Sequence, residues 1–138
     1  MRIAISSEPK LLPILQGTVR WQARESGFSE ADAESLALAI DEAAANVIRY
    51  SYGGRPGLML SLEMAAHPDR MEFILEDSGP KVKAPAGRSP LPGDVCPGGS
   101  ETPFIQTAID TSCYDTGSAA GNRLKLVKFL PGKAPGSE

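Results

Sequence analysis

The chain of 138 residues is poor in the residues from which metal sites and disulfide frameworks are built. Its single histidine, His67, lies in the turn-forming string His67-Pro68-Asp69, which argues against histidine-based catalysis and multi-histidine metal sites. Its two cysteines, Cys96 and Cys113, are too few for a disulfide framework or a metal cluster. We therefore expect one loop thiol and one small buried hydrophobe.

Long apolar runs and basic runs are also missing. No apolar segment approaches the roughly 18 residues of a membrane span, and the N-terminal residues lack the apolar core of a signal peptide. The net charge is −3, without a cluster of lysines or arginines. We therefore expect a cytoplasmic protein that has neither nucleic acid nor a membrane as its partner.

Glycine and proline, in contrast, are abundant. The 14 glycines and 12 prolines make up about a fifth of the chain, where about 12% is usual. They concentrate in three segments, since ten lie in 79–99, four in 53–57 and four in 131–136. This distribution predicts one folded domain with a few pronounced loops, which suits a chain of this length.

Apolar periodicity and turn signals predict the order strand, helix, helix, strand, strand, loop, helix, strand, strand. Ser29, with Asp32 three residues later, is typical of a helix N-terminal cap. The order favours an α+β fold in which helices cover one face of a mixed, mostly antiparallel sheet. The predicted elements are 2–6, 9–26, 30–50, 58–64, 71–77, 104–111, 113–115 and 122–129.

The second predicted helix carries polar residues in an alanine-rich segment. Glu42 and Asn46 are four residues apart, so they project from the same helix face. A solvated polar face is one interpretation of such a pair. The other is a ligand site, because a carboxylate and an amide oxygen can hold a hydrated Mg²⁺ ion.

Three glycine-containing motifs follow this helix at the ends of predicted elements. Each is weak alone, because such strings are common in turns. A glycine-rich turn that opens a helix also offers free backbone N–H groups to a phosphate. The motifs are Asp77-Ser78-Gly79, Pro97-Gly98-Gly99-Ser100 and Gly121-Asn122-Arg123.

Taken in order, the helical pair and the three glycine motifs resemble the GHKL superfamily of ATP-binding domains. Within it, the strings at 41–52 and 104–110 are most similar to the anti-sigma-factor serine/threonine kinases, the RsbW-like family. The similarity covers residues 1–128. It implies a two-layer, histidine-kinase-like ATPase (Bergerat-type) fold. It also implies a single ATP-binding domain at 1–130, a lid at about 79–103 and a flexible tail at 131–138.

The resemblance also implies residue roles. Glu42 matches the general base of the family, Asn46 matches its Mg²⁺ ligand, and Asp77 matches the carboxylate that binds the adenine amino group. The remaining nucleotide-binding positions implied by the resemblance are Arg49, Gly79, Gly98, Gly99, Ser100, Gly121 and Asn122.

The implied function is that of an ATP·Mg²⁺-dependent anti-sigma-factor kinase. Its partners would be a sigma factor, a STAS-type anti-sigma antagonist that carries the phosphorylated serine, and a second copy of the chain in a homodimer. Lys81, Glu101 and Pro103 depart from the glycine-rich lid of the family. They support an alternative, a non-catalytic binding module on the same scaffold. An ATPase module of histidine-kinase type is a third interpretation, which the place of His67 in a turn disfavours.

Overall fold

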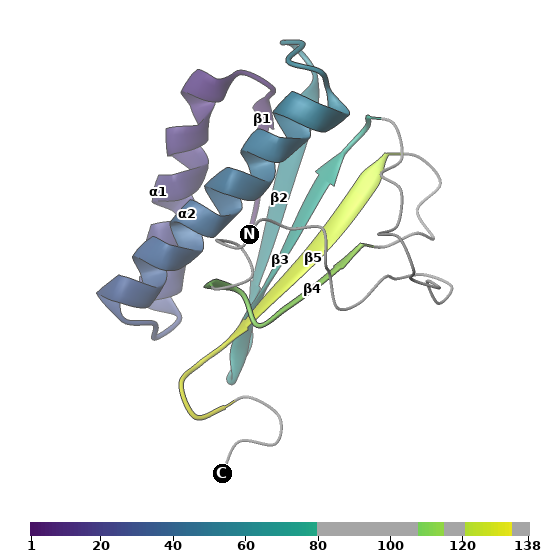
Figure 1. The fold of residues 1–138 in the computed structure, drawn as a ribbon. Coiled ribbons are helices and arrows are strands. Elements are labelled where there is room, and N and C mark those ends of the chain that lie inside the picture. Colours follow the sequence, from purple (N-terminus) through teal and green to yellow (C-terminus); the bar gives the residue numbers. More distant parts are fainter. Residues whose placement is uncertain (80–107, 115–120, 134–138) are drawn as a thin grey trace.

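The computed structural model describes residues 1–79, 108–114 and 121–133, which form two layers (Figure 1). Two helices lie side by side on one face of a five-stranded sheet, so the expected two-layer α+β architecture is confirmed. In chain order the elements are β1 (Arg2–Ser6), a 3₁₀ turn (Pro9–Leu11), α1 (Leu12–Glu25), α2 (Glu30–Asn46), a π-helical turn (Val47–Ser51), β2 (Met59–Ala66), β3 (Arg70–Asp77), β4 (Thr111–Tyr114) and β5 (Asn122–Phe129).

The sheet has the strand order β1-β2-β3-β5-β4. Every pairing between these described strands is antiparallel, where the sequence had predicted a mixed and mostly antiparallel sheet. The pairing of β3 with β5 sets Asp77, the last residue of β3, directly opposite Asn122, the first residue of β5. Two segments 45 residues apart in the chain therefore meet at one end of the sheet.

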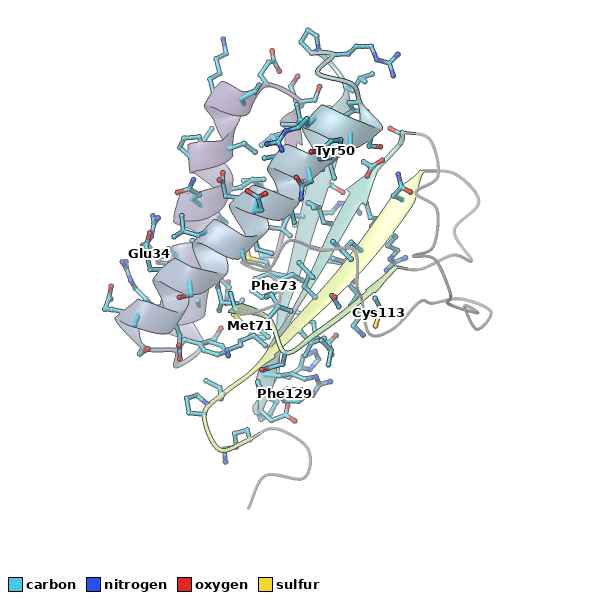
Figure 2. All side chains as sticks on the ribbon, in the orientation of Figure 1. Glu34, Tyr50, Met71, Phe73, Cys113 and Phe129 are labelled. Carbon is cyan, nitrogen blue, oxygen red and sulfur yellow. The ribbon has the colours of Figure 1, made fainter. Side chains whose placement is uncertain are left out.

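The two helices are held by the apolar stripes that the sequence predicted. The hydroxyl of Ser29 accepts a hydrogen bond from the Asp32 amide at 3.1 Å, which confirms the predicted cap of α2. Met71 and Phe73 point from β3 into the space between the layers (Figure 2). Other fully buried side chains include Leu15, Val19, Leu36, Ile40, Leu60, Leu62 and Leu126.

Within the described part of the chain, no helix is both long and apolar enough to cross a bilayer.

The C-terminal end of α2 departs from regular helix. The predicted helix to residue 50 divides into α2, which ends at Asn46, and the π-helical turn Val47–Ser51. The Tyr52 amide closes this turn by donating to the Val47 carbonyl at 2.9 Å, across five residues. Gly53 and Gly54 then take φ angles of 60° and 79°, so the chain leaves the helix at the predicted place.

The helix predicted at 104–111 is wrong at its C-terminal end. Residues 104–107 lie outside the described residues, and Ala108 is helical, but Thr111 already belongs to β4. Asp110 is bonded to the sheet instead: its amide donates to the Val127 carbonyl at 2.9 Å, and its carboxylate accepts from the Phe129 amide at 2.7 Å. Hydrogen bonds to β5 thus replace the helical ones that the sequence pattern suggested.

The two cysteines also differ from expectation. Cys113 on β4 (Figure 2) is half-buried and disulfide-bonded, so the prediction that these positions hold free thiols was wrong. Cys96, the other cysteine of the chain, lies outside the described residues. A disulfide requires two cysteine backbones within about 7 Å of each other, and sequence spacing alone does not encode that proximity.

Candidate functional site

The candidate site lies at one end of the molecule, beyond the C-terminal end of α2 (Figure 1). The last residue of β3 and the first residue of β5 reach the same end. Ser51, the last residue of the π-helical turn, joins the helix layer to them through a hydrogen bond to Asp77. The fold therefore brings two of the four predicted motifs into contact, and the turn that follows the helical motif bonds to them through Ser51.

Asp77 is the centre of the hydrogen bonds at this end. Its Oδ1 atom accepts from the Ser51 hydroxyl at 2.9 Å, from the Asn122 side-chain amide at 2.9 Å and from the Gly79 backbone amide at 2.8 Å. Its Oδ2 atom has no hydrogen-bond partner among the described residues, although Asp77 is half-buried. One oxygen is held and the other is available, so the carboxylate presents an acceptor in a fixed direction.

Two glycines allow the backbones to approach Asp77 this closely. A Cβ atom at Gly121 would lie 1.9 Å from the Asp77 carbonyl oxygen, and a Cβ atom at Gly79 would lie 2.0 Å from the Ser51 hydroxyl oxygen. Gly121 also has a φ of +72°, which side-chain-bearing residues rarely adopt. Both positions were predicted as site residues, and the structure supplies a steric reason for glycine at each.

Gly121→Ala is expected to lower the free energy of unfolding by about 2–5 kcal/mol, because the left-handed backbone and the clash with β3 both act against it. Gly53→Ala is the matched control, since Gly53 has a φ of +60° and a Cβ atom there would meet no other atom within 4 Å. That variant is expected to lose only the backbone part, about 1–2 kcal/mol. Urea denaturation of both proteins measures the difference. Equal decreases in the free energy of unfolding would show that the close approach of residue 121 to the Asp77 carbonyl does not contribute to stability.

Tyr52 connects the C-terminal end of the helix layer to the β2–β3 hairpin through hydrogen bonds. Its ring is buried at 1% exposure, and its hydroxyl donates to the Met59 carbonyl. The same hydroxyl accepts from the Ser78 amide at 2.9 Å. Tyr52 therefore bonds both to the first residue of β2 and to the residue that follows Asp77. These bonds hold the C-terminal end of the helix layer in position relative to the end of β3.

Glu42 and Asn46 lie on one face of the last turns of α2, as their spacing predicted. Both are half-buried, and neither side chain has a hydrogen bond or ion pair with another described residue. Ala43 and Ala44, which share these turns, are buried against the sheet. A carboxylate and an amide are thus held on a packed helix with their polar atoms available to a ligand.

Arg49 lies on the outer side of the π-helical turn. Its guanidinium donates to the Tyr50 hydroxyl at 3.4 Å and sits 5.3 Å from the centre of that ring. The hydrogen bond to Tyr50 is the main cause that raises the pKa of Arg49, and the charge of Glu42 adds to it. Both side chains are exposed, Tyr50 at 73%. Arg49 therefore offers a permanent positive charge at the end of the molecule that carries Glu42.

The donor set fits Mg²⁺ better than a metal that needs a full protein cage. Within residues 1–79, 108–114 and 121–133 no group of three or more His, Cys, Asp or Glu side chains could hold a metal ion. Mg²⁺ keeps several waters and takes one or two protein oxygens together with substrate phosphates. The side-chain amide of Asn46, which has no hydrogen bond to another described residue, meets that limited requirement.

The remaining predicted positions are outside the described residues. These are Gly98, Gly99 and Ser100, together with Lys81, Glu101 and Pro103, on which the non-catalytic alternative rests. Of the predicted residues that are described, Asp77, Gly79, Gly121 and Asn122 lie in direct contact, and Glu42, Asn46 and Arg49 line the adjoining helix end.

Sequence reasoning missed Ser51 as part of the site. A serine five residues after Asn46 lies beyond the predicted helix, and regular helical geometry gives it no defined direction. The only available signal was its place between two tyrosines just before Gly53-Gly54, where a helix end can turn a side chain toward the sheet.

Comparison with known proteins agrees with this geometry. The model of the histidine kinase-like ATPase domain matches residues 5–128. The serine-protein kinase RsbW of Halalkalibacterium halodurans is 28% identical over 94% of this chain and 83% of its own length. RsbW of Bacillus subtilis is 24% identical over 57% of this chain, and the alignment spans about half of that protein.

A solved structure shares the fold. The crystal structure of the RsbU and RsbW domains of a Mycobacterium tuberculosis protein superimposes with a TM-score of 0.58 at 13% identity. The alignment covers 94% of this chain and 32% of the mycobacterial chain. The match of the family model over nearly the whole sequence shows that the chain belongs to the histidine kinase-like ATPase domain family.

Proposed function

We propose that this chain binds ATP with Mg²⁺ and transfers the γ-phosphoryl group to a serine or threonine of a protein substrate. The observation that carries the proposal is the Asp77 carboxylate, whose Oδ1 accepts from three donors while Oδ2 has no partner among the described residues. Such an acceptor suits the exocyclic amine of adenine. The RsbW relatives, which are named serine-protein kinases, support a protein as the acceptor.

The residues on α2 would act at the phosphate end of the nucleotide. Asn46 would hold Mg²⁺, which when bound neutralises charge on the phosphates. Glu42 would accept the proton of the attacking serine or threonine hydroxyl. The oxygen of that hydroxyl would form the new bond to the γ-phosphorus as the bond to ADP breaks and ADP leaves. Arg49, with its permanent positive charge, would pair with phosphate oxygens. Gly98, Gly99 and Ser100 would contribute backbone N–H groups to the same phosphates.

The regulatory setting is proposed from the same relatives. We infer a cytoplasmic anti-sigma factor, with residues 1–130 as its ATP-binding domain, that sequesters a sigma factor and phosphorylates a STAS-type antagonist. We also propose that the chain forms a homodimer. β1 is an edge strand of the described sheet, so a strand of a second copy could pair with its open edge.

Calorimetric titration with ATP and MgCl₂ tests nucleotide binding directly. We expect saturable binding with a dissociation constant below about 1 mM, weaker binding of GTP, and a rise in thermal stability with ATP concentration. At 100 times the dissociation constant, a ligand that binds only the folded state stabilises it by about 2.7 kcal/mol. Absence of heat and of a thermal shift at millimolar nucleotide would contradict the proposal.

A non-catalytic binding module is the second candidate, favoured by Lys81, Glu101 and Pro103 in the segment where the family has a glycine-rich lid. An acidic side chain there would repel a triphosphate, and proline removes an N–H donor. An assay of labelled phosphate transfer from ATP to a STAS-type protein distinguishes the two candidates. If the chain is a kinase, the STAS-type protein should become labelled. If it is a non-catalytic binding module, the two proteins should form a complex without transfer of the label.

A further inference from the structure

We propose that Ser51 is a positioning residue for base recognition, which orients the Asp77 carboxylate and thereby favours 6-aminopurine over other purine nucleotides. The inference rests on the proposed binding of ATP and deepens it. Ser51 would not touch the nucleotide. It would act through Asp77, whose Oδ2 atom would accept the hydrogen bond from the adenine amine.

The hydrogen bonds at Asp77 define which of its oxygens a ligand can use. A carboxylate oxygen has about two lone-pair sites, and Oδ1 already accepts from Ser51, Asn122 and Gly79. A fourth donor at Oδ1 would find no free lone pair. A nucleobase amine must therefore bind at Oδ2, the oxygen whose direction depends on how firmly Oδ1 is held.

Ser51 completes a three-membered network. Its hydroxyl has one hydrogen, which goes to Asp77 at 2.9 Å, and its oxygen lies 3.3 Å from the Asn122 side-chain nitrogen. Asn122 also donates to Asp77 at 2.9 Å. The network thus contacts the carboxylate from the helix end and from β5, so rotation of the carboxylate would break bonds on both sides.

The space around Ser51 is matched to its hydroxyl. A Cβ atom at Gly79 would lie 2.0 Å from the Ser51 hydroxyl oxygen and 3.0 Å from its carbonyl oxygen. Glycine at position 79 therefore leaves room for the hydroxyl, and its own amide donates to the same Asp77 oxygen at 2.8 Å. Ser51 is half-buried, so this contact is part of the packed end of the fold.

The π-helical turn directs Ser51 toward β3. Widening one turn by a residue rotates the side chains that follow by about 100° relative to a regular α-helix. As a result Ser51 contacts Asp77, while its neighbour Tyr50 is 73% exposed and lies on the outer side (Figure 2). Such turns occur frequently at functional sites.

Ser51→Ala, measured with two nucleotides, tests the inference. The probes are ATP and purine riboside 5′-triphosphate, which lacks the 6-amino group, each titrated with MgCl₂ into the full chain. We expect Ser51→Ala to weaken ATP binding about five- to tenfold, as for a hydrogen bond to a charged group. Binding of the purine riboside triphosphate should change less than about twofold, because that nucleotide has no amine for Oδ2.

The ratio of the two affinities separates positioning from folding. An inactive fraction in the Ser51→Ala preparation would affect both nucleotides equally and leave the ratio unchanged. Ser61→Ala is the control, since that hydroxyl lies on β2, where it accepts from the Arg2 guanidinium at 3.4 Å. In an Asp77→Ala background, which has no carboxylate to position, adding Ser51→Ala should no longer change the ratio.

Equal weakening of both nucleotides, or none, would overturn the role of Ser51 while leaving ATP binding intact. Absence of ATP binding by the unaltered protein would instead overturn the proposed function, and this inference with it.

Discussion

Glu42→Gln is expected to slow phosphoryl transfer about 10²- to 10⁴-fold, while the affinity for ATP changes less than about threefold. A positioned general base contributes a rate factor of this size. Glutamine keeps the shape of glutamate but cannot take a proton from the attacking hydroxyl. Glu42 has no hydrogen bond to another described residue, so the substitution should leave α2 intact. Single-turnover transfer of labelled phosphate to a STAS-type protein measures the rate.

Glu34→Gln is the matched control on the same helix. Glu34 (Figure 2) lies two turns earlier and pairs with Arg20 at 2.7 Å, with about half of its side chain exposed. Its loss should change stability by less than about 1 kcal/mol and leave transfer unaffected. Transfer that persists in Glu42→Gln would remove Glu42 from the role of base.

Asp77→Asn is expected to weaken ATP binding about 100-fold and to make inosine triphosphate the better ligand. The oxygen of asparagine can still accept from Ser51 and Asn122, so the network around it should survive. Its NH₂ group would then replace Oδ2 and face the adenine amine, donor against donor. A lost hydrogen bond to a charged group and an unsatisfied donor together account for a change of this size. Inosine presents a carbonyl at the same position, which the NH₂ group can donate to.

Competition of ATP and inosine triphosphate against a fluorescent nucleotide measures this reversal. Asp69→Asn is the control, because Asp69 lies in the turn between β2 and β3, where it pairs with Arg70 at 2.7 Å. That variant should keep the preference for ATP. A variant Asp77→Asn that still prefers ATP would show that another group reads the purine.

Local chemistry made much of the fold predictable. The alternation in 58–64 and 71–77 and the cap at Ser29 depend on residues close in sequence, and β2, β3 and α2 confirm them. The shared face of Glu42 and Asn46 follows from helical spacing in the same way. The glycines at 79 and 121 were predicted as site positions from the order of motifs, whereas the steric reason for glycine at each became visible only in the structure.

Long-range contacts account for the errors. The pattern at 104–111 suggested helix, yet Asp110 bonds to Val127 and Phe129, and Thr111 already belongs to β4. The disulfide at Cys113 likewise depends on which distant segment lies near β4. Ser51 was missed because its direction is set by the π-helical turn and by the hairpin to which Tyr52 is tied.

The scarcity of histidine, of cysteine and of long apolar runs argued against other classes of protein. Apolar periodicity, turn signals and the order of four short motifs were then sufficient to predict the two-layer fold and the family. The signals for the helices and strands are local, because caps, alternation and helical spacing act over a few residues. The hydrogen-bonded arrangement around Asp77 was decided only by tertiary structure. It joins residues 26 and 45 positions apart, and the pairing of β3 with β5 and the widened end of α2 determine which of them meet.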